Sequence, residues 1–262
     1  MKQITPLALA LLLIGCTGSN PPATSSASSS VAAAAPATAE PQVTSLDLLD
    51  QARNRAVPVL LYLPPAATTK RAKLKLALLS HGYGGKNTAY SFIARNLVAH
   101  GYAVASVQHD LPTDEPLPQT GNPRVVRRPV WERGVQNLLF VRQEMERLHP
   151  EIDAKHLLLL GHSNGGDISV LFTEQHPELV EKVISLDNRR LPLPRTRQPR
   201  ILSIRSSDQL ADQGVLPTPA EQATFGITIT LLPNTIHNDM WDGATEAQKQ
   251  EISQIISSFL ES

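Results

Sequence analysis

The chain has 262 residues, a formal net charge of zero at pH 7, 41% hydrophobic residues and 4% aromatic residues. This length and apolar content suit one domain with a substantial core. The balanced charge argues against a nucleic-acid partner, and the scarcity of aromatic residues argues against a surface that stacks bases or sugars.

The first sixteen residues have the pattern of an export signal. Lys2 supplies a positive charge, and residues 6–14 form an apolar run that is shorter than the roughly 20 residues needed to span a bilayer. The run ends in Leu-Ile-Gly-Cys at residues 13–16, and Cys16 is the chain's single cysteine. This resembles the lipobox of bacterial lipoproteins, which implies that residues 1–15 are a cleaved signal peptide and that Cys16 carries lipid. The alternative is an ordinary secretory signal followed by a chance cysteine.

Residues 17–42 consist almost entirely of Ser, Ala, Thr and Pro, with one charge at Glu40. Such a stretch buries too little apolar surface to offset the entropy of ordering it, so we expect residues 16–42 to be a lipidated, disordered tether. As a flexible coil it would reach on the order of 30 Å. Thr17 stands after the cysteine instead of Asp, which by analogy with Gram-negative lipoproteins favours the outer membrane. The expected location is therefore the cell envelope, on a bacterial membrane.

The remaining residues, 43–262, are expected to form one α/β domain. Short apolar, β-prone segments alternate with segments of helical periodicity. This alternation predicts a doubly wound, mostly parallel sheet covered by helices on both faces, with ligands bound beyond the carboxyl ends of the strands. The expected strands are 57–63, 74–80, 102–107, 156–160, 183–186, 201–204 and 227–232, and the expected helices are 89–100, 131–148, 165–176 and 246–260.

The strand expected at 156–160 runs directly into Gly-His-Ser-Asn-Gly at residues 161–165, and a helix follows. The pattern G-x-S-x-G is weak by itself, but a tight strand-to-helix turn is the context in which it presents a nucleophile. Such a turn projects Ser163 above the sheet, and the N-terminus of the following helix offers free N–H groups to an oxyanion. Ser163 is therefore the predicted nucleophile.

From these residues the chain, over about residues 57–260, is identified as a member of the α/β-hydrolase superfamily. Residues 79–85, Leu-Ser-His-Gly-Tyr-Gly-Gly, resemble the loop after the third strand in the dienelactone-hydrolase and bacterial polyester-hydrolase branch. The resemblance implies that the oxyanion hole consists of the backbone N–H groups of Tyr83 and Asn164. It also implies that His81 and His162 support the two turns.

The same resemblance places the remaining two catalytic residues after later strands, in the order Ser, Asp or Glu, His. Asp208 follows the strand at 201–204 and is the expected acid, and His237 follows the last strand and is the expected base. Asp187, at the end of the strand at 183–186, stays open as an alternative acid. His109 also follows a strand, but the order of the residues disfavours it as the base, and it is expected to be structural or to line the pocket.

Three further features bear on the substrate. Only about a dozen residues separate Leu186 from Pro199, which is too short for a large lid, so an open cleft is expected, with the loop at 109–129 as a substitute lid. Trp241 is close enough to His237 in sequence to line the pocket. A basic run is expected to be solvated, with anionic lipid headgroups as the alternative contact; it comprises Arg189, Arg190, Arg195, Arg197 and Arg200.

The predicted activity is hydrolysis of carboxylic esters through an acyl-enzyme, outside the cytoplasm. No metal or cofactor is expected, because the sequence lacks metal-ligand spacings and a phosphate-binding glycine loop. The expected partners are a small or polymeric ester and the membrane; the oligomeric state is open, with a monomer as the default. The alternatives are an amidase or peptidase, an acyltransferase, or a non-catalytic envelope lipoprotein of the same fold.

Overall fold

The computed structural model of the chain describes Met1, residues 40–65 and residues 73–262. The chain divides into two units, Met1–Ala37 and Thr38–Ser262, and all described helices and strands belong to the second. Apart from Met1, the predicted signal peptide lies outside the described residues, as do Cys16 and nearly all of the predicted tether. Within the described ranges, no helix combines the length and apolar character needed to cross a bilayer.

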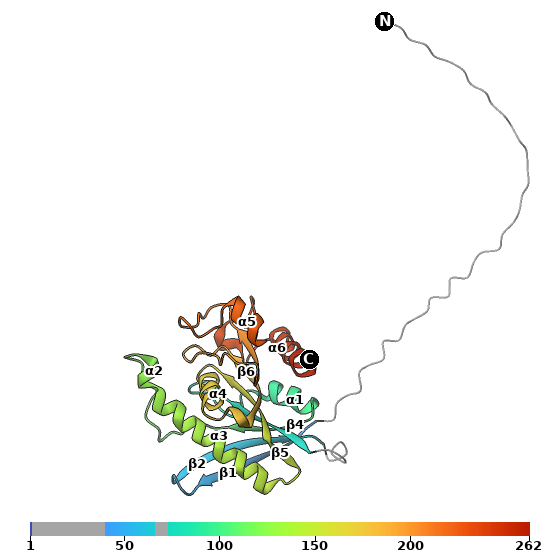
Figure 1. The fold of residues 1–262 in the computed structure, drawn as a ribbon. Helices are drawn as coiled ribbons and strands as arrows, with labels where there is room; N and C mark the ends of the chain where they lie inside the picture. The colour runs from blue at the N-terminus through green and yellow to red at the C-terminus, as the bar shows by residue number, and fades with distance from the viewer. Residues whose placement is uncertain (2–39, 66–72) are drawn as a thin grey trace, which may run out of the picture. The chain divides into compact units, whose positions relative to one another are not determined.

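The second unit is built on a sheet whose strand order is β1-β2-β4-β3-β5-β6-β7-β8 in the described part of the chain (Figure 1). The β1–β2 and β2–β4 pairs are antiparallel, and every other neighbouring pair is parallel. The predicted mostly parallel sheet is therefore confirmed. The bounds of the strands are β1 Gln42–Asp50, β2 Arg55–Leu63, β3 Leu74–Ser80, β4 Tyr102–Val107, β5 Ile152–His162, β6 Val180–Leu186, β7 Arg200–Arg205 and β8 Thr228–Leu231.

Helices cover both faces of this sheet (Figure 1). Side chains of a strand alternate between its faces, and in β3 this sends Leu76 and Leu78 into the core under α3 and α4, and Ala77 and Leu79 into the core under α1 and α6. The parallel strands are therefore apolar on both sides, as their uninterrupted hydrophobic runs predict. The helices are α1 Ser91–Ala99, α2 Pro123–Val126, α3 Arg128–Leu148, α4 Asn164–Gln175, α5 Pro219–Phe225 and α6 Glu246–Glu261, with short 3₁₀ turns at η2 Pro177–Leu179 and η3 His237–Asp239.

The expected strands and helices are all present, and the largest shift is in β5, which begins at Ile152 and not at His156. Hydrophobic periodicity did not predict β1, because this edge strand mixes Asp, Ser and Thr with apolar residues and leaves most of its side chains exposed. It also missed α2 and α5. A signal for α5 was available, since Thr218 and Glu221 form a capping box at its start.

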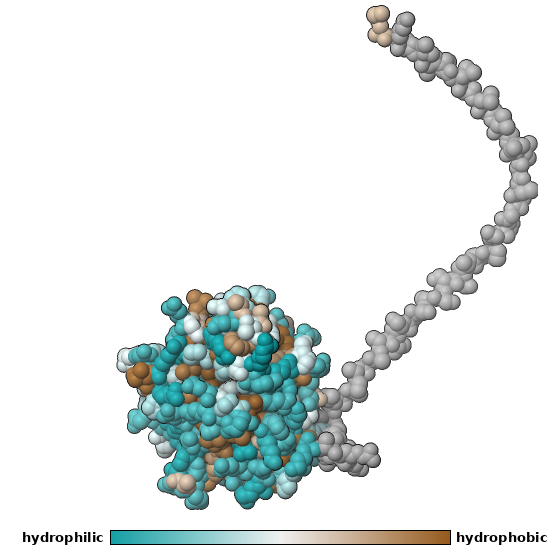
Figure 2. Space-filling view, viewed as in Figure 1, coloured by the Kyte–Doolittle hydropathy of each residue, from teal (hydrophilic) through white to brown (hydrophobic). Residues whose placement is uncertain are grey.

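The connection between β6 and β7, residues 187–199, contains no helix or strand. The chain therefore has no large lid at this position, as the short spacing predicted. On the face drawn in Figure 2, hydrophobic residues form small areas within a mostly hydrophilic surface. The apolar residues of the domain thus lie mainly in the two cores.

Candidate active site

Ser163 stands on a sharp turn between two elements that the sequence specifies closely. β5 ends at His162, α4 begins at Asn164, and Ser163 between them has φ 52° and ψ −115°. A positive φ is costly for a residue with a side chain, so the surrounding structure must hold it. The flanking glycines allow the fit: a Cβ on Gly161 would lie 2.1 Å from the backbone oxygen of Gly165, and one on Gly165 would lie 2.4 Å from that of Ser80.

His237 links Ser163 to a buried carboxylate. It begins the η3 turn after β8, and its Nε2 lies 2.9 Å from Ser163 Oγ. Its Nδ1 lies 2.5 Å from Oδ2 of Asp187. An ionised carboxylate can only accept a hydrogen bond, so Nδ1 carries the proton and donates a hydrogen bond to Asp187. Nε2 is then left with a lone pair that accepts a hydrogen bond from the hydroxyl of Ser163.

Asp187 is fully buried, and its surroundings keep it ionised. Burial acts to raise its pKa, but the hydrogen bond from His237, the Arg205 cation and the hydrogen bonds from Ser206 outweigh burial and lower it. Arg205 forms an ion pair with Oδ1 at 2.8 Å, and Ser206 donates from its hydroxyl to Oδ2 at 2.7 Å. Asp187 also has φ 57°. Together with Ser163, it is one of three non-glycine residues with a positive φ in the described part of the chain.

The expectation that Asp208 holds the imidazole is wrong. Asp208 is exposed, and its Oδ1 accepts a hydrogen bond from the backbone N–H of His237 at 2.7 Å. That bond lowers the pKa of Asp208. The alternative, Asp187, occupies the position beside the ring because it follows β6, which pairs directly with β5, the strand that carries Ser163. Asp208 follows β7, one strand further away, and reaches only the main chain of the histidine loop.

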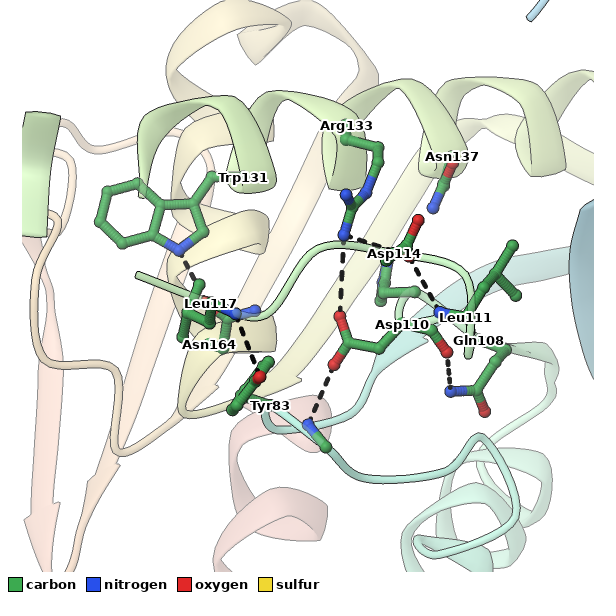
Figure 3. A network of polar contacts seen from close by, with 12 residues as sticks. Tyr83, Gln108, Asp110, Leu111, Asp114, Leu117, Trp131, Arg133, Asn137 and Asn164 are labelled. Atoms are coloured by element: carbon green, nitrogen blue, oxygen red, sulfur yellow. Dashed lines mark hydrogen bonds and ion pairs between the residues drawn. The ribbon is translucent and has the colours of Figure 1, made fainter. Parts of the chain in front are cut away.

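Tyr83 and Asn164, the expected oxyanion residues, both line a cavity beside Ser163. Asn164 is the first residue of α4, and its side-chain oxygen accepts a hydrogen bond from the indole N–H of Trp131 at 2.8 Å. Trp131 is fully buried in α3, so this bond connects the helix to the turn that carries Ser163 (Figure 3).

The loop after β4 holds Tyr83 from the other side (Figure 3). The hydroxyl of Tyr83 accepts a hydrogen bond from the backbone N–H of Leu117 at 3.0 Å, and the N–H of Gly84 donates to Asp110 at 3.0 Å. Arg133 in α3 forms ion pairs with Asp110 at 4.0 Å and Asp114 at 3.2 Å. The segment expected as a substitute lid therefore lies between α3 and the loop of Tyr83 and is held to both.

A buried chain of hydrogen bonds connects this loop to the serine turn. The N–H of Gly82 donates to the hydroxyl of Tyr90 at 3.2 Å, and that hydroxyl is hydrogen-bonded to Nδ1 of His162 at 2.8 Å. Burial lowers the pKa of His162 to about 3 and raises that of Tyr90 to about 12, so both side chains are neutral. His162 was expected as a support, whereas Tyr90 was missed, because its position in the chain carries no recognisable signal.

His81 and His109 have structural roles. Nδ1 of His81 donates to the carbonyl of Gly82 at 2.7 Å, and its Nε2 accepts from the backbone N–H of His109 at 2.9 Å. His109 is buried and contacts Ser80 Oγ through Nε2 at 2.9 Å. Its pKa is lowered well below the usual value by burial and by the neighbouring histidine and arginines. It lines neither of the two cavities that contain Ser163.

These two cavities meet at Ser163. The larger has a volume of ≈ 710 Å³ and contains His237, Tyr90 and Trp241 in its walls, which confirms the expected position of Trp241. The smaller has a volume of ≈ 230 Å³ and lies toward α4 and the loop after β6. Among the residues that the structure describes, no three His, Cys, Asp or Glu side chains are grouped as metal ligands would be.

Known proteins resemble this chain mainly in fold. A family model described as platelet-activating factor acetylhydrolase, isoform II, matches residues 56–113, which include the loop of Tyr83 but none of Ser163, Asp187 and His237. No curated protein matches the sequence.

Solved structures match nearly the whole folded unit. A ferulic acid esterase from Streptomyces cinnamoneus is 18% identical, with a TM-score of 0.62 over 87% of this chain and 91% of that one. A dienelactone hydrolase from Anabaena variabilis is 15% identical, with a TM-score of 0.56 over 85% and 98%. An α/β serine hydrolase without lid from Xanthomonas campestris is 16% identical, with a TM-score of 0.56 over 85% and 94%. The fold is therefore that of the lidless α/β-hydrolases.

Proposed function

We propose that this protein is a serine hydrolase that cleaves carboxylic esters through an acyl-enzyme on Ser163. The observation that carries the proposal is the continuous contact from Ser163 Oγ to His237 Nε2 and from His237 Nδ1 to Asp187. A hydroxyl, a base and a buried carboxylate in this order form the arrangement that activates a serine as a nucleophile. The family model and the esterases among the similar structures support the same reaction class.

In the proposed reaction, Ser163 Oγ attacks the ester carbonyl while His237 Nε2 takes its proton. Asp187 keeps the imidazole in the tautomer that this transfer needs and stabilises the imidazolium that results. The N–H groups of Tyr83 and Asn164 are proposed to bind the oxyanion. His237 then gives its proton to the departing alkoxide, and water, activated by the same imidazole, releases the acid from Ser163.

The test compares the full-length chain with Ser163→Ala on short and medium p-nitrophenyl esters. We expect kcat to fall on the order of 10⁴-fold or more, since the remaining groups stabilise the transition state only weakly without a nucleophile. Ser258→Ala, on the exposed face of α6, is the matched control and should retain activity. A fluorophosphonate probe should label the parent and Ser258→Ala but not Ser163→Ala.

Equal hydrolysis by the parent and Ser163→Ala would contradict the assignment of the nucleophile. A folded parent that neither hydrolyses any ester nor reacts with the probe would favour a non-catalytic envelope protein of the same fold. Product analysis in the presence of alcohols separates a hydrolase from an acyltransferase, because only the latter would form a new ester.

We further propose that a lipid on Cys16 holds the protein on a bacterial membrane. The apolar run, the Leu-Ile-Gly-Cys sequence at residues 13–16 and the Ser, Ala, Thr and Pro content of residues 17–42 support this proposal. Several acyl chains together give stable anchoring where a single chain does not. In cells fed labelled palmitate, the full-length chain should take up label and sediment with membranes, as should a Ser19→Ala control. Cys16→Ser should do neither, and an unlabelled parent would contradict the proposal.

A further inference from the structure

The two cavities at Ser163 differ in charge as well as in size. The larger is lined by His237, by apolar groups such as Ala89 and Trp241, and by one cation and one carboxylate, Lys86 and Asp242. The smaller, of ≈ 230 Å³, is lined by three arginines together with Tyr83, Leu117, Gln119, Asn164 and Asp167. The arginines are Arg127, Arg189 and Arg190. A cationic chamber therefore adjoins the nucleophile on one side only.

The fold assembles this chamber from distant segments. Arg127 directly precedes α3, whereas Arg189 and Arg190 follow β6. Asp167 in α4 holds the second segment in place, because its Oδ1 accepts the backbone N–H groups of Arg190 at 3.1 Å and of Leu191 at 2.9 Å. Burial raises the pKa of Asp167 to about 6, so this carboxylate is mostly ionised at neutral pH and offsets one of the three arginine charges.

The rest of the basic run in the sequence has other roles. Arg195 donates to the carbonyls of Leu193 and Val215, and Arg200 lies over the ring of Phe259 at 4.8 Å. Arg197 is exposed and lines neither cavity at Ser163. The run is therefore not one patch, because Arg189 and Arg190 are half-buried and line the smaller cavity at Ser163.

Two of the three cations lack an acidic partner. Arg190 forms an ion pair with Asp212 at 2.6 Å. Arg127 contacts only neutral acceptors, the carbonyl of Pro118 at 3.0 Å and the side-chain oxygen of Gln119 at 3.3 Å. Within the described ranges, neither Arg127 nor Arg189 has a carboxylate within ion-pair distance, and the buried Nε of Arg189 has no hydrogen-bond partner.

Arg127 and Arg189 therefore leave positive charge in the smaller cavity without an ion-pair partner among the described residues. Burial and the neighbouring Arg190 and Arg189 cations lower the pKa of Arg127, and they outweigh the carboxylates of Asp167 and Asp212, which act to raise it. An unpaired buried donor costs free energy that a bound acceptor would recover. A carboxylate matches the planar, multiple N–H donors of guanidinium groups in shape and charge.

The position of His237 decides which part of an ester enters the cationic chamber. The departing alkoxide must take its proton from His237 Nε2, so the alcohol part has to leave on the side of the imidazole. His237 lines the larger cavity and not the smaller one. The acyl part then extends from the carbonyl carbon in the other direction, toward the arginines.

We propose that the smaller cavity is an acyl subsite for a short chain that ends in a carboxylate, so that the preferred substrates are half-esters of short dicarboxylic acids. This inference rests on the proposed ester hydrolysis at Ser163. The cavity is below the range of about 300–1,000 Å³ typical of drug-sized ligand pockets, which suits a chain of a few carbons. The ester C–O bond breaks, water supplies OH to the acyl carbon and H to the alkoxide, and the products are a dicarboxylate and an alcohol.

The test uses esters matched in chain length and leaving group. Mono-p-nitrophenyl adipate and p-nitrophenyl hexanoate differ by the terminal carboxylate, and the uncatalysed rate of each is subtracted. We expect kcat/KM of the full-length chain to be at least tenfold higher for the adipate, and added salt to reduce this ratio. Arg127→Gln and Arg189→Gln should each lower the ratio about tenfold. Arg197→Gln, from the same basic run, should leave it unchanged.

Two further measurements test the subsite by inhibition of the parent and test the orientation of the substrate. Adipate itself should inhibit hexanoate hydrolysis by the parent more strongly than hexanoate anion does. A charge on the leaving group, as in 4-(hexanoyloxy)benzoate compared with phenyl hexanoate, should bring no preference that depends on Arg127.

An adipate-to-hexanoate ratio near one in the parent, or a ratio unchanged in both arginine variants, would overturn the subsite while hexanoate turnover kept the proposed function intact. A preference for the charged leaving group that Arg127→Gln removes would overturn the orientation of the acyl chain. Absence of turnover with every ester, together with no fluorophosphonate labelling, would instead reject the proposed function.

Discussion

The turns after β6 and β7 each present an aspartate to His237, but the two carboxylates bind different parts of it. Asp187 is completely buried and contacts Nδ1 of the ring, with Arg205 and Ser206 around it. Asp208 is exposed and contacts the backbone N–H of the same residue. A position at the end of a strand is therefore not sufficient to make a carboxylate the hydrogen-bond partner of the imidazole ring. The distance of the carboxylate from the strand of the nucleophile and its degree of burial decide whether it polarises the base or positions the loop.

The effects of Asp187 and Asp208 on kcat should differ most when each carboxylate is replaced by an amide. In Asp187→Asn, the amide can donate a hydrogen bond to the ring and so favours the wrong imidazole tautomer. We expect kcat for p-nitrophenyl esters to fall about 10³–10⁴-fold, as in other enzymes with this arrangement. Steady-state kinetics at constant pH, with circular dichroism to check the fold, measures this. A fall of less than tenfold would remove Asp187 from the catalytic arrangement.

The second test concerns the support of Asp187. Arg205→Leu leaves a buried carboxylate without its ion-pair partner, and we expect the free energy of unfolding to fall by about 3–5 kcal/mol. Denaturant titration measures it. Arg200→Leu, at the other end of the same strand, is the control. It loses hydrogen bonds to Ser262 and its contact with Phe259 at a partly exposed site, so about 1 kcal/mol is expected.

The pH dependence of the Arg205→Leu effect has a defined sign. The folded protein holds the pKa of Asp187 below its usual value, so the contribution of the ionised carboxylate is fully present above the unfolded pKa of about 4 and is lost as pH falls through the lower folded pKa. Removing Arg205 takes away one of the groups that oppose burial, so the pKa of Asp187 in folded Arg205→Leu should lie above that in the folded parent. The gap in stability between the parent and Arg205→Leu should therefore be largest at neutral pH and narrow as pH falls from the higher pKa of the variant toward the lower pKa of the parent. A gap that stays constant down to acid pH would mean that Asp187 is not the group that Arg205 supports.

The smallest effect is expected at Asp208. Asp208→Asn keeps an oxygen that can accept the backbone N–H of His237, so kcat should change less than threefold. Asp208→Ala removes this hydrogen bond, typically about 1 kcal/mol, and kcat should fall about fivefold. If Asp208→Asn were as inactive as Asp187→Asn, both aspartates would be needed to hold the imidazole of His237, whereas the geometry gives this role to Asp187 alone.

The parts of the site that could be predicted from sequence are those built by neighbouring residues. Ser163 and its turn follow from five consecutive residues, because Gly161 and Gly165 are needed where backbones approach closely. His237 follows from its place between the last strand and the last helix. The sheet and its two helical layers follow from hydrophobic periodicity. β1 was not predicted, because an exposed edge strand has little hydrophobic periodicity.

The parts that could not be predicted depend on which strands lie side by side. Asp187 and Asp208 both follow strands in the sequence, and only the order of β5, β6 and β7 places Asp187 beside the imidazole. The link from Gly82 through Tyr90 to His162 likewise joins the loop after β3 to the end of β5, and Tyr90 and His162 are 72 residues apart in the chain.

The amino-acid sequence by itself thus determined the fold class and the absence of a large lid, and it pointed to Ser163 and His237 as the proposed nucleophile and base, because each depends on local pattern or on segment length. Only the tertiary structure decided which aspartate serves the base and that Arg127 joins Arg189 and Arg190 beside Ser163. These choices depend on distances between segments far apart in the chain. Such distances are set by strand order and by the packing of α3 and α4, which no single stretch of the sequence encodes.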